Sequence, residues 1–263
     1  MCLALLALDA HPRYAIVLAA NRDEFRARAA DEAHWWDDDI LAGRDRLAGG
    51  TWLGVNRRGR FAFVTNVREP GRYDPAAPTR GTLVPGVLQD ARPIATAVSH
   101  ALADGARMNG FNLLAGEGTQ ACWASNRADA IAALAPGVHG VSNAALDTPW
   151  PKLLRTRDAL GAWLRSGEES VEPLFEVLAD RRPAADEELP HTGVTLEWER
   201  MLSSPFIVAP HYGTRCSTVV LFARDGEVRF VERSFDEHGR ASGEVEHRFV
   251  VETVRQRSAS AIV

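Results

Sequence analysis

Cys2 has the clearest chemical potential in this sequence, because it directly follows Met1. Removal of Met1 before a small residue leaves a cysteine that carries both a thiol and a free α-amino group. The pKa of such an amine is about 7.7–8.0, so near neutral pH it can take the thiol proton and later pass it to a leaving group. The residue type and position predict a nucleophile that needs no catalytic histidine. The alternative interpretation is a small buried hydrophobe at the start of an edge strand.

A polar segment at residues 21–24 ends an apolar run abruptly. In it, Asp23 can hold an α-ammonium group, Arg22 can favour a thiolate or bind an anionic substrate, and Asn21 can orient either group. The alternative is a solvated strand terminus without a chemical role.

The first two apolar runs, residues 3–8 and 14–20, are separated by a proline-containing segment that favours a turn. We therefore expect a β-hairpin with its turn near His11. The antiparallel register then places Cys2 opposite Ala20 and next to Asn21, so the chain start and the polar segment meet in space.

A second hairpin is predicted from the runs 52–56 and 61–66, with Gly59 in the turn. Asn66 ends its second strand, and its side-chain amide can donate a hydrogen bond to a developing oxyanion. The alternative for Asn66 is simple turn formation at a strand end.

The remaining pattern predicts an α+β fold with largely antiparallel sheets. Apolar periodicity indicates helices at 82–90, 92–103, 152–165 and 171–179, and strands at 111–115, 121–124, 217–223, 227–234 and 245–253. Strands, then helices, then strands argue against a βαβ fold, and no GxGxxG or P-loop motif is present. The length favours one domain over residues 1–263.

Composition favours small-molecule partners. The net charge of -5 arises from 30 basic and 35 acidic residues mixed along the chain, which provides no field for nucleic acid and no polybasic membrane patch. The apolar runs are strand-length and the chain start lacks a basic signal region, so we expect a cytoplasmic protein without stable membrane insertion. Nothing in the pattern predicts an oligomeric state.

Metal and disulfide chemistry have little support in the sequence. The three cysteines, Cys2, Cys122 and Cys216, show no CxxC spacing, and the eight histidines show no HxH or HxxxH spacing. We therefore expect no metal site and no required cofactor. Among the aromatic residues, Trp35 and Trp36 are candidates for a pocket mouth, whereas Trp52 is expected in the core.

Several motifs in a fixed order resemble the NRDE family, also called the Transport and Golgi organisation family. They are MCLALLALDA, LAANRDEF, GGTWLGVN, TN, NGFNLLAG, GVSNAALDTPWPK and YGTRCSTVVLF, which together reach from Met1 to about Phe222. The family resembles N-terminal-nucleophile hydrolases, which implies a four-layer αββα sandwich. The resemblance also implies a mechanism similar to that of the cysteine acylases of penicillin V and conjugated bile acids.

The resemblance implies roles for particular residues. Cys2 matches the acylase nucleophile, and Asp23 matches the aspartate that positions the free amine. Asn66 follows a G-x-N-x-x-G segment at 54–59, as does the acylase oxyanion asparagine. Asn143 corresponds to a later acylase asparagine, and Arg215 corresponds to a C-terminal arginine.

One departure concerns Arg22. The acylases have their arginine before the asparagine of this motif, whereas Arg22 follows Asn21. Its side chain can therefore face away from the site.

Three function classes follow from these observations. The first is hydrolysis of a non-peptide amide or related acyl bond by Cys2, with Asn66 and Asn143 at the oxyanion. The second, raised by the resemblance, is a carrier that binds haem or an acyl-lipid or acyl-coenzyme A ligand without turnover. Cys2 or His11 would then ligate iron, while Arg22 or Arg215 would meet propionates or phosphates. The third is a purely structural interaction module.

Overall fold

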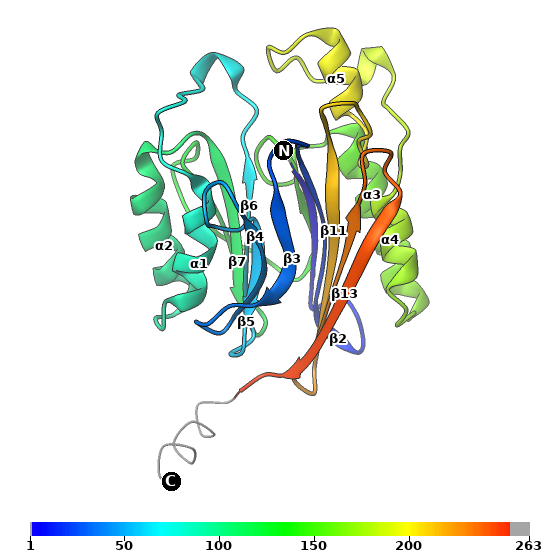
Figure 1. Ribbon diagram of the computed structural model, residues 1–263. Helices are drawn as coiled ribbons and strands as arrows, with labels where there is room; N and C mark the ends of the chain where they lie inside the picture. Colours follow the sequence, from blue (N-terminus) through cyan, green and yellow to red (C-terminus); the bar gives the residue numbers. More distant parts are fainter. Residues whose placement is uncertain (1, 253–263) are drawn as a thin grey trace.

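Two antiparallel β-sheets face each other in the computed structural model, which describes residues 2–252 (Figure 1). The six-stranded sheet has the order β10 (Gly137–Val141), β1 (Cys2–Leu8), β2 (Tyr14–Phe25), β11 (Tyr212–Ala223), β12 (Glu227–Phe235) and β13 (Ala241–Val250). The seven-stranded sheet has the order β3 (Ala30–Trp35), β4 (Ile40–Asp45), β5 (Leu53–Asn56), β6 (Arg60–Asn66), β7 (Phe111–Glu117), β8 (Gln120–Ser125) and β9 (Ala132–Ala133).

Helices cover the outer face of each sheet, which gives four layers in the order αββα (Figure 1). The seven-stranded sheet carries α1 (Leu83–Gln89) and α2 (Ile94–Asp104). The six-stranded sheet carries α3 (Pro151–Ser166) and α4 (Glu172–Leu178), and α5 (Leu196–Leu202) lies near the start of β11. The α+β sandwich expected from the sequence is confirmed.

Three apolar clusters separate these layers, and strand alternation decides which residues enter each. Along β1, Ala4, Leu6 and Leu8 pack between the two sheets. The intervening Leu3 and Leu5 pack against α3 and α4. A third cluster fills the space between the seven-stranded sheet and α1 with α2. β1 therefore lies inside a sheet and is buried on both faces, rather than at an edge.

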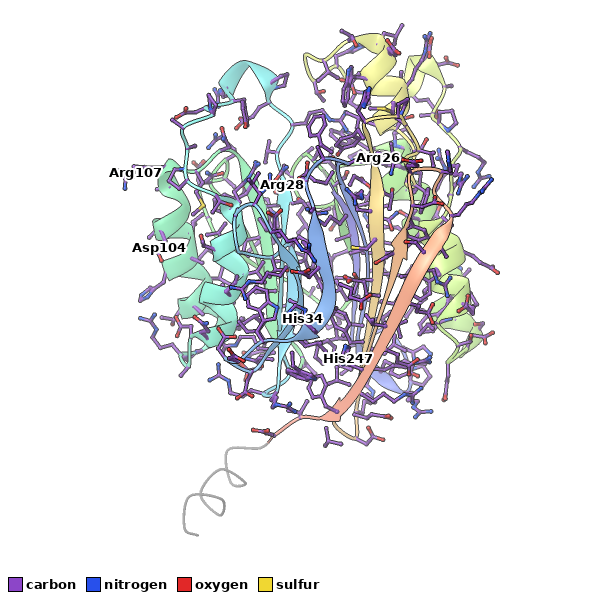
Figure 2. All side chains as sticks on the ribbon, viewed as in Figure 1. Arg26, Arg28, His34, Asp104, Arg107 and His247 are labelled. Carbon is purple, nitrogen blue, oxygen red and sulfur yellow. The ribbon has the colours of Figure 1, made fainter. Side chains whose placement is uncertain are left out.

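The two sheets also meet at their edges near β3 and β13. His34 and His247 lie in this region (Figure 2), where Nε2 of His247 is 3.1 Å from the carbonyl oxygen of Ala33. Trp35 packs edge-on against Phe249, with ring centroids 5.1 Å apart. Trp35 thus belongs to this inter-sheet contact and not to the mouth of the pocket described below.

Most predicted elements are present, and four strands and one helix were missed. The predicted helices correspond to α1–α4, and the turns at Gly59 and Gly226 have the positive φ values of 80° and 92° that favour glycine. No prediction was made for β3, β4, β9, β10 or α5. The predicted strand 245–253 corresponds to the end of β13, and its last residue, Thr253, lies outside the described residues.

Candidate active site

The register of the β1–β2 hairpin places Cys2 directly opposite Arg22. The predicted partner, Ala20, is wrong by two residues, because the strand pairing is centred on Pro12 and not on His11, so that Ala20 pairs with Ala4. A shift of two preserves the alternation of faces, so the prediction that the chain start meets segment 21–24 is confirmed. Met1 lies outside the described residues.

Alternation along β2 sends the three neighbouring polar side chains in two directions. Asn21 lies on the helix side, where its Nδ2 donates to the carbonyls of Leu178 (2.8 Å) and Pro205 (2.9 Å). Its Oδ1 accepts a 2.6 Å hydrogen bond from Ser217. These partners make Asn21 a link between β2, β11 and the end of α4, and it does not line the described pocket.

Asp23 also lies on the helix side and is 1% exposed. Its Oδ1 accepts a 2.7 Å hydrogen bond from the hydroxyl of Thr214, which in turn accepts one from the backbone N–H of Ile207. Burial raises the pKa of the Asp23 carboxyl to about 6, against the opposing effects of the Lys152 charge and the Thr214 hydrogen bond. Asp23 is therefore a buried carboxyl that keeps its proton to a higher pH than an ordinary aspartate.

Arg22 occupies the space between the sheets. Its guanidinium lies 4.4 Å from the ring of Trp52, and Nη2 is 3.2 Å from Oδ2 of Asp45 at the end of β4. The same Asp45 oxygen accepts a 2.6 Å hydrogen bond from Arg28. Arg22 thus contributes positive charge next to Cys2 in the sheet, while Asp45 fixes the guanidinium and balances part of that charge.

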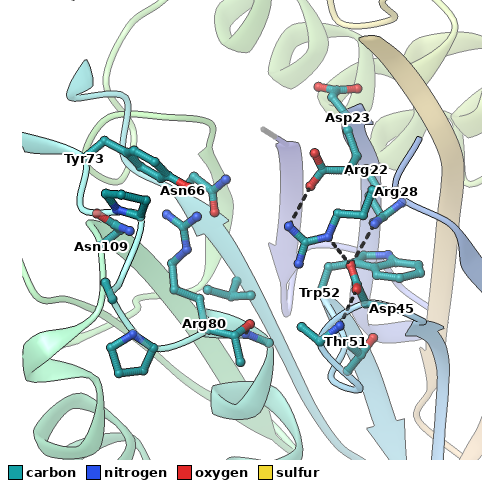
Figure 3. Close-up of a pocket in the computed structure, with 18 of the residues that line it drawn as sticks. Arg22, Asp23, Arg28, Asp45, Thr51, Trp52, Asn66, Tyr73, Arg80 and Asn109 are labelled. Atoms are coloured by element: carbon teal, nitrogen blue, oxygen red, sulfur yellow. Dashed lines mark hydrogen bonds and ion pairs between the residues drawn. The ribbon is translucent and has the colours of Figure 1, made fainter. Parts of the chain in front are cut away.

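A cleft of about 220 Å³ opens between this end of β2 and the end of β6. In Figure 3, Arg22, Arg28 and Asp45 form one wall, and Asn66 and Arg80 stand on the opposite wall. The remaining lining residues come mainly from β2, the segment after β4 and the loop after β6: Asp23, Glu24, Ala48, Thr51, Trp52, Val64, Tyr73, Asp74, Pro75, Ala77, Pro78, Thr79, Gly81 and Asn109. The cleft is polar, with aromatic and proline side chains at its sides.

The fold places Asn143 next to Asn66, but Asn143 does not line the cleft. Asn143 is buried, and its Nδ2 donates a 2.9 Å hydrogen bond to the main-chain carbonyl of Asn66. The Asn143 carbonyl accepts from the N–H of Arg68 at 2.8 Å. Asn143 therefore holds the backbone that carries Asn66, whereas Asn66 itself lines the cleft.

Arg215 lies at a β-bulge of β11, between Thr214 and Cys216. Its Nη1 donates to the carbonyls of Phe25 (3.3 Å) and Arg26 (3.0 Å). Burial lowers the pKa of Arg215, and the positive charges of Arg22 and Arg26 act in the same direction. Arg215 supports the end of β2 and does not line the described cleft.

His11 is far from the cleft, at the opposite end of the β1–β2 hairpin. It is stacked between Tyr14 and Trp163, with centroid distances of 4.9 and 5.1 Å. Its Nδ1 accepts backbone N–H groups of Arg13 and Tyr14. Because β1 is seven residues long, roughly 20 Å separates this end from Cys2, so the two cannot ligate one iron atom.

Four charged or aromatic residues near the site were missed from the sequence. Trp52 was expected in the core, and it does pack against the apolar cluster between the sheets, but it also lines the cleft beneath Arg22. Lys152 of α3 is 2% exposed and acts on Asp23, and Arg68 forms a buried 2.6 Å ion pair with Glu199. Two nitrogens of Arg68, Nε and Nη2, have no hydrogen-bond partner among the described residues, and its guanidinium lies 4.8 Å from the ring of Trp150. A signal for Lys152 was present, because PWPK closes one of the family motifs.

Two other kinds of site are absent from the described part of the chain. Within residues 2–252, no three side chains of the His, Cys, Asp and Glu types are grouped so that they could hold a metal ion. No helix in that part is both long and apolar enough to cross a lipid bilayer.

Comparison with known proteins gives one family and one fold. The profile of the family described as Transport and Golgi organisation 2 matches residues 1–237. The Transport and Golgi organization protein 2 homologs of Bos taurus and Homo sapiens are 35% and 36% identical to this chain, each over 89% of it and 93% of the relative. The crystal structure of the C2A mutant of conjugated bile acid hydrolase from Clostridium perfringens superposes with a TM-score of 0.52 at 10% identity, covering 96% of this chain and 97% of that one.

Proposed function

This chain belongs to the Transport and Golgi organisation 2 family and has the fold of an N-terminal-nucleophile hydrolase, and from that premise we propose that it hydrolyses a non-peptide amide or related acyl bond with Cys2 as nucleophile. One observation carries the proposal. Cys2 is paired with Arg22 and adjoins Asp23, and Asn66 stands across the cleft that Arg22 and Asp23 line. The bile acid hydrolase also has a cysteine as its second residue, which its solved C2A mutant replaces with alanine, and this agreement in position supports the proposal.

The proposed reaction begins once Met1 has been removed. The α-amine of Cys2 takes the thiol proton, and the thiolate attacks the substrate carbonyl to give a tetrahedral intermediate. The intermediate collapses to a thioester on Cys2, and the ammonium passes its proton to the departing amine. Water, deprotonated by the same amine, then hydrolyses the thioester and frees the acid.

Three side chains assist these steps. The Asn66 amide donates to the oxyanion, and Asn143 holds the Asn66 backbone in place through the 2.9 Å hydrogen bond. Arg22 favours the thiolate through its positive charge, which Asp45 and Trp52 keep in a fixed position.

The cleft also favours a class of substrate. Its lining includes Arg28 and Arg80 on opposite walls together with Trp52 and Tyr73, which suits a small acyl compound with one anionic or strongly polar end. The volume of about 220 Å³ accommodates a small acyl group more readily than a folded peptide.

The experiment that tests the proposal follows Cys2 directly. Intact mass and peptide mapping establish whether Met1 is absent and whether a small electrophile labels Cys2 faster than the buried Cys122 and Cys216. Panels of activated amides and thioesters then report acyl-Cys2 formation by mass spectrometry. We expect a mass increase on Cys2 that disappears with time and is absent from the Cys2→Ala protein.

Two outcomes would overturn the proposal. Retention of Met1 in protein from its native host removes the free amine and with it the mechanism. A processed protein that forms no acyl-Cys2 across the panels, yet binds haem or an acyl-coenzyme A saturably, would identify a carrier instead. The position of His11 at the far end of the hairpin gives no support to a ligand pair with Cys2.

A further inference from the structure

Arg68 is buried without a full set of hydrogen-bond partners. Its side chain is 4% exposed, and Nη1 forms the 2.6 Å ion pair with Oε2 of Glu199 on α5. Its guanidinium lies 4.8 Å from the ring centroid of Trp150. The other two nitrogens, Nε and Nη2, are enclosed by the protein and have no acceptor among residues 2–252. Burying charged donors without partners is costly, so this edge of the guanidinium calls for a functional explanation.

Glu199 cannot satisfy the two remaining donors by turning toward them. Its Oε1 accepts hydrogen bonds from the backbone N–H and the hydroxyl of Thr192, at 2.8 and 2.6 Å. Its Oε2 accepts from Nη1 of Arg68. A rotation that brought the carboxylate to Nε and Nη2 would break these bonds. The ion pair therefore fixes the guanidinium and leaves one of its edges for another acceptor.

Nε and Nη2 form the edge of a guanidinium that binds a carboxylate side-on, through two parallel N–H···O bonds. Arg229 shows this arrangement in the same chain. Its Nε donates to Oε1 of Glu246 and its Nη2 donates to Oε2, each at 3.0 Å. The unpaired edge of Arg68 thus has the geometry that matches a carboxylate, whose two oxygens accept both N–H groups at once.

Arg60 is a buried arginine of the same kind whose nitrogens all have partners. Its side chain is 3% exposed, and both Nε and Nη2 donate to Oε2 of Glu117. Nη1 and Nη2 also donate to main-chain carbonyls at the end of α1 and just after it. Burial and a glutamate partner are common to the two arginines, so the unpaired edge is what distinguishes Arg68 from Arg60.

Arg68 lies beside the residues that are proposed to act at the oxyanion. It follows Asn66 by two residues, and its backbone N–H donates a 2.8 Å hydrogen bond to the carbonyl of Asn143. Asn143 in turn donates to the carbonyl of Asn66, which lines the cleft. The chain then continues into residues 73–81, most of which also line the cleft. Arg68 is therefore tied by short hydrogen bonds to the wall on which Asn66 stands.

We propose that Nε and Nη2 of Arg68 bind a carboxylate group of the ligand through a side-on pair of hydrogen bonds. The inference rests on the proposed function for the source of that carboxylate, which is either the acid released from acyl-Cys2 or the far end of an acyl group. Glu199 and Trp150 hold the guanidinium in place before the ligand binds, which lowers the entropic cost of binding. Because both nitrogens are enclosed, a ligand reaches them only when a neighbouring side chain moves aside, and a small carboxylate is the suitable probe.

The test titrates the full-length protein, labelled with ¹⁵N, with sodium acetate near neutral pH, and uses sodium chloride as the reference for ionic strength. Two NMR signals are followed: the Nε–H of Arg68 and the indole N–H of Trp150, which lies against the guanidinium. We expect both signals to move saturably with acetate and not with chloride. Arg68→Lys keeps the charge opposite Glu199 but lacks the side-on edge, so we expect the affinity for acetate, measured at Trp150, to fall about tenfold or more.

Arg60→Lys is the matched control, because Arg60 is as buried as Arg68 and is paired with a glutamate but has no unpaired edge. We expect this variant to retain the acetate affinity of the wild type. Arg28→Lys tests an arginine of the cleft as the alternative anion site. Loss of acetate binding in Arg28→Lys but not in Arg68→Lys would overturn the inference, and so would an equal response to chloride.

A second measurement covers the case in which Arg68→Lys does not fold. In the wild-type protein, the Nε–H signal of Arg68 is assigned through its bonds to the Arg68 backbone, and its exchange with solvent hydrogen is measured with and without acetate. A carboxylate bound to this N–H should slow the exchange by about tenfold or more. An exchange rate that acetate does not change would show that the carboxylate is not bound there and would overturn the inference.

Two thioesters distinguish the sources of the carboxylate. An acetyl thioester has an uncharged acyl group, whereas a succinyl thioester carries a carboxylate at its far end. If Arg68→Lys lowers acyl-Cys2 formation from the succinyl thioester alone, the site holds the far end of the acyl group. If Arg68→Lys instead weakens inhibition by acetate for both thioesters alike, the site holds the released acid, and either result supports binding at Arg68.

The acetate measurements need no turnover, so they separate this inference from the hydrolase proposal. Acetate binding at Arg68 in a protein that forms no acyl-Cys2 contradicts the hydrolase proposal alone. Formation of acyl-Cys2 in a protein whose Arg68 does not respond to acetate overturns only the carboxylate site.

Discussion

Nη2 of Arg22 on β2 reaches Oδ2 of Asp45 on β4 across 3.2 Å, and so joins the two sheets beside the cleft. Both side chains are almost fully buried, and Arg28 shares the same oxygen. Removing one partner of a buried pair leaves the other charge in a region of low polarity, which is costly. This ion pair therefore contributes to the fold as well as to the charge beside Cys2.

Asp45→Asn is expected to destabilise the protein by about 3–5 kcal/mol, because it leaves Arg22 buried without its counter-charge. Urea denaturation followed by tryptophan fluorescence measures the change. Asp186→Asn is the control, since Asp186 pairs with Arg200 on the surface with both side chains about half exposed, and its loss should cost less than about 1 kcal/mol. Equal effects of the two substitutions would show that the inter-sheet pair has no special energetic role.

Asp23→Asn should stabilise the protein at neutral pH while abolishing acyl-Cys2 formation. The pKa of Asp23 is raised from 3.8 to about 6 in the folded state, so the folded protein holds its proton more tightly than the unfolded chain. Stability is therefore lost as pH rises from about 4 to about 6, by roughly 3 kcal/mol in total. Asn avoids this loss and can still accept the Thr214 hydrogen bond. Urea titrations at several pH values should show that the free energy of unfolding of the variant exceeds that of the wild type by an amount that grows through this pH range and then stays constant. A difference that does not depend on pH would show that the pKa of Asp23 is not raised in the folded protein.

His11 and His139 should change stability in opposite directions with pH. Burial lowers the pKa of His11, so the folded protein favours the neutral ring. The contribution of His11 to the free energy of unfolding is therefore complete above the unfolded-state pKa of 6.5 and is lost as pH falls. The hydrogen bond with Asp147 raises the pKa of His139, so its contribution is present below 6.5 and is lost as pH rises through the folded value.

The comparison uses His11→Phe, which preserves an aromatic ring in the stack, and His139→Gln. Between about pH 8 and about pH 5, we expect the first variant to lose less stability than the wild type, and the second to lose more. Each substitution also removes hydrogen bonds whose contribution to stability does not depend on pH. That contribution cancels, because the comparison uses the difference in stability between two pH values. If both variants lost more stability than the wild type between these pH values, or both lost less, the directions of the two pKa shifts would be contradicted.

Asn66→Asp should lower the rate of acyl-Cys2 formation by about 10²–10³-fold, because it replaces a donor with a negatively charged acceptor where the oxyanion forms. Asn143→Ala is expected to have a smaller effect on that rate, together with a loss of stability of about 1–3 kcal/mol, since it removes the donor to the Asn66 carbonyl inside the protein. Single-turnover mass spectrometry and thermal unfolding measure the two quantities. If Asn143→Ala lowered the rate of acyl-Cys2 formation more than Asn66→Asp does, Asn143 would itself donate to the oxyanion, as the family resemblance implies.

Apolar periodicity was sufficient for the α+β class, because it is strong in the segments that form β1, β2, β6, β7 and α1–α4, whereas the four-layer arrangement followed from the family resemblance. It failed for β3, whose residues ADEAHW alternate poorly because the strand lies at a sheet edge and only Ala33 of it is fully buried. It also misplaced the partner of Cys2 by two residues, since composition does not fix the residue about which the strands of a hairpin pair.

Parts of the candidate site can be proposed from residue type and position, whereas other parts depend on which residues pack against each other in the fold. Cys2 and Asp23 follow from position and from the family motifs. By contrast, Lys152 follows a proline at a helix start, a place where a lysine is ordinarily solvated, and its ammonium group is bonded to Leu202 of α5, which is distant in sequence. Asn143 could be connected with Asn66, but a motif cannot tell a side chain that lines a cleft from one that supports its wall.

Asn21 and Asp23 point to one face of the sheet and Arg22 points to the other, which limits how the length of β2 can change among related sequences. Asn21 and Asp23 serve the helix layer, and Arg22 serves the space between the sheets. Inserting or deleting one residue just before Asn21 would exchange the two faces and place a guanidinium under the helices and two polar groups between the sheets. Related sequences can therefore accumulate substitutions along β2, whereas a change in its length must be compensated by a bulge, as β11 already provides at Arg215.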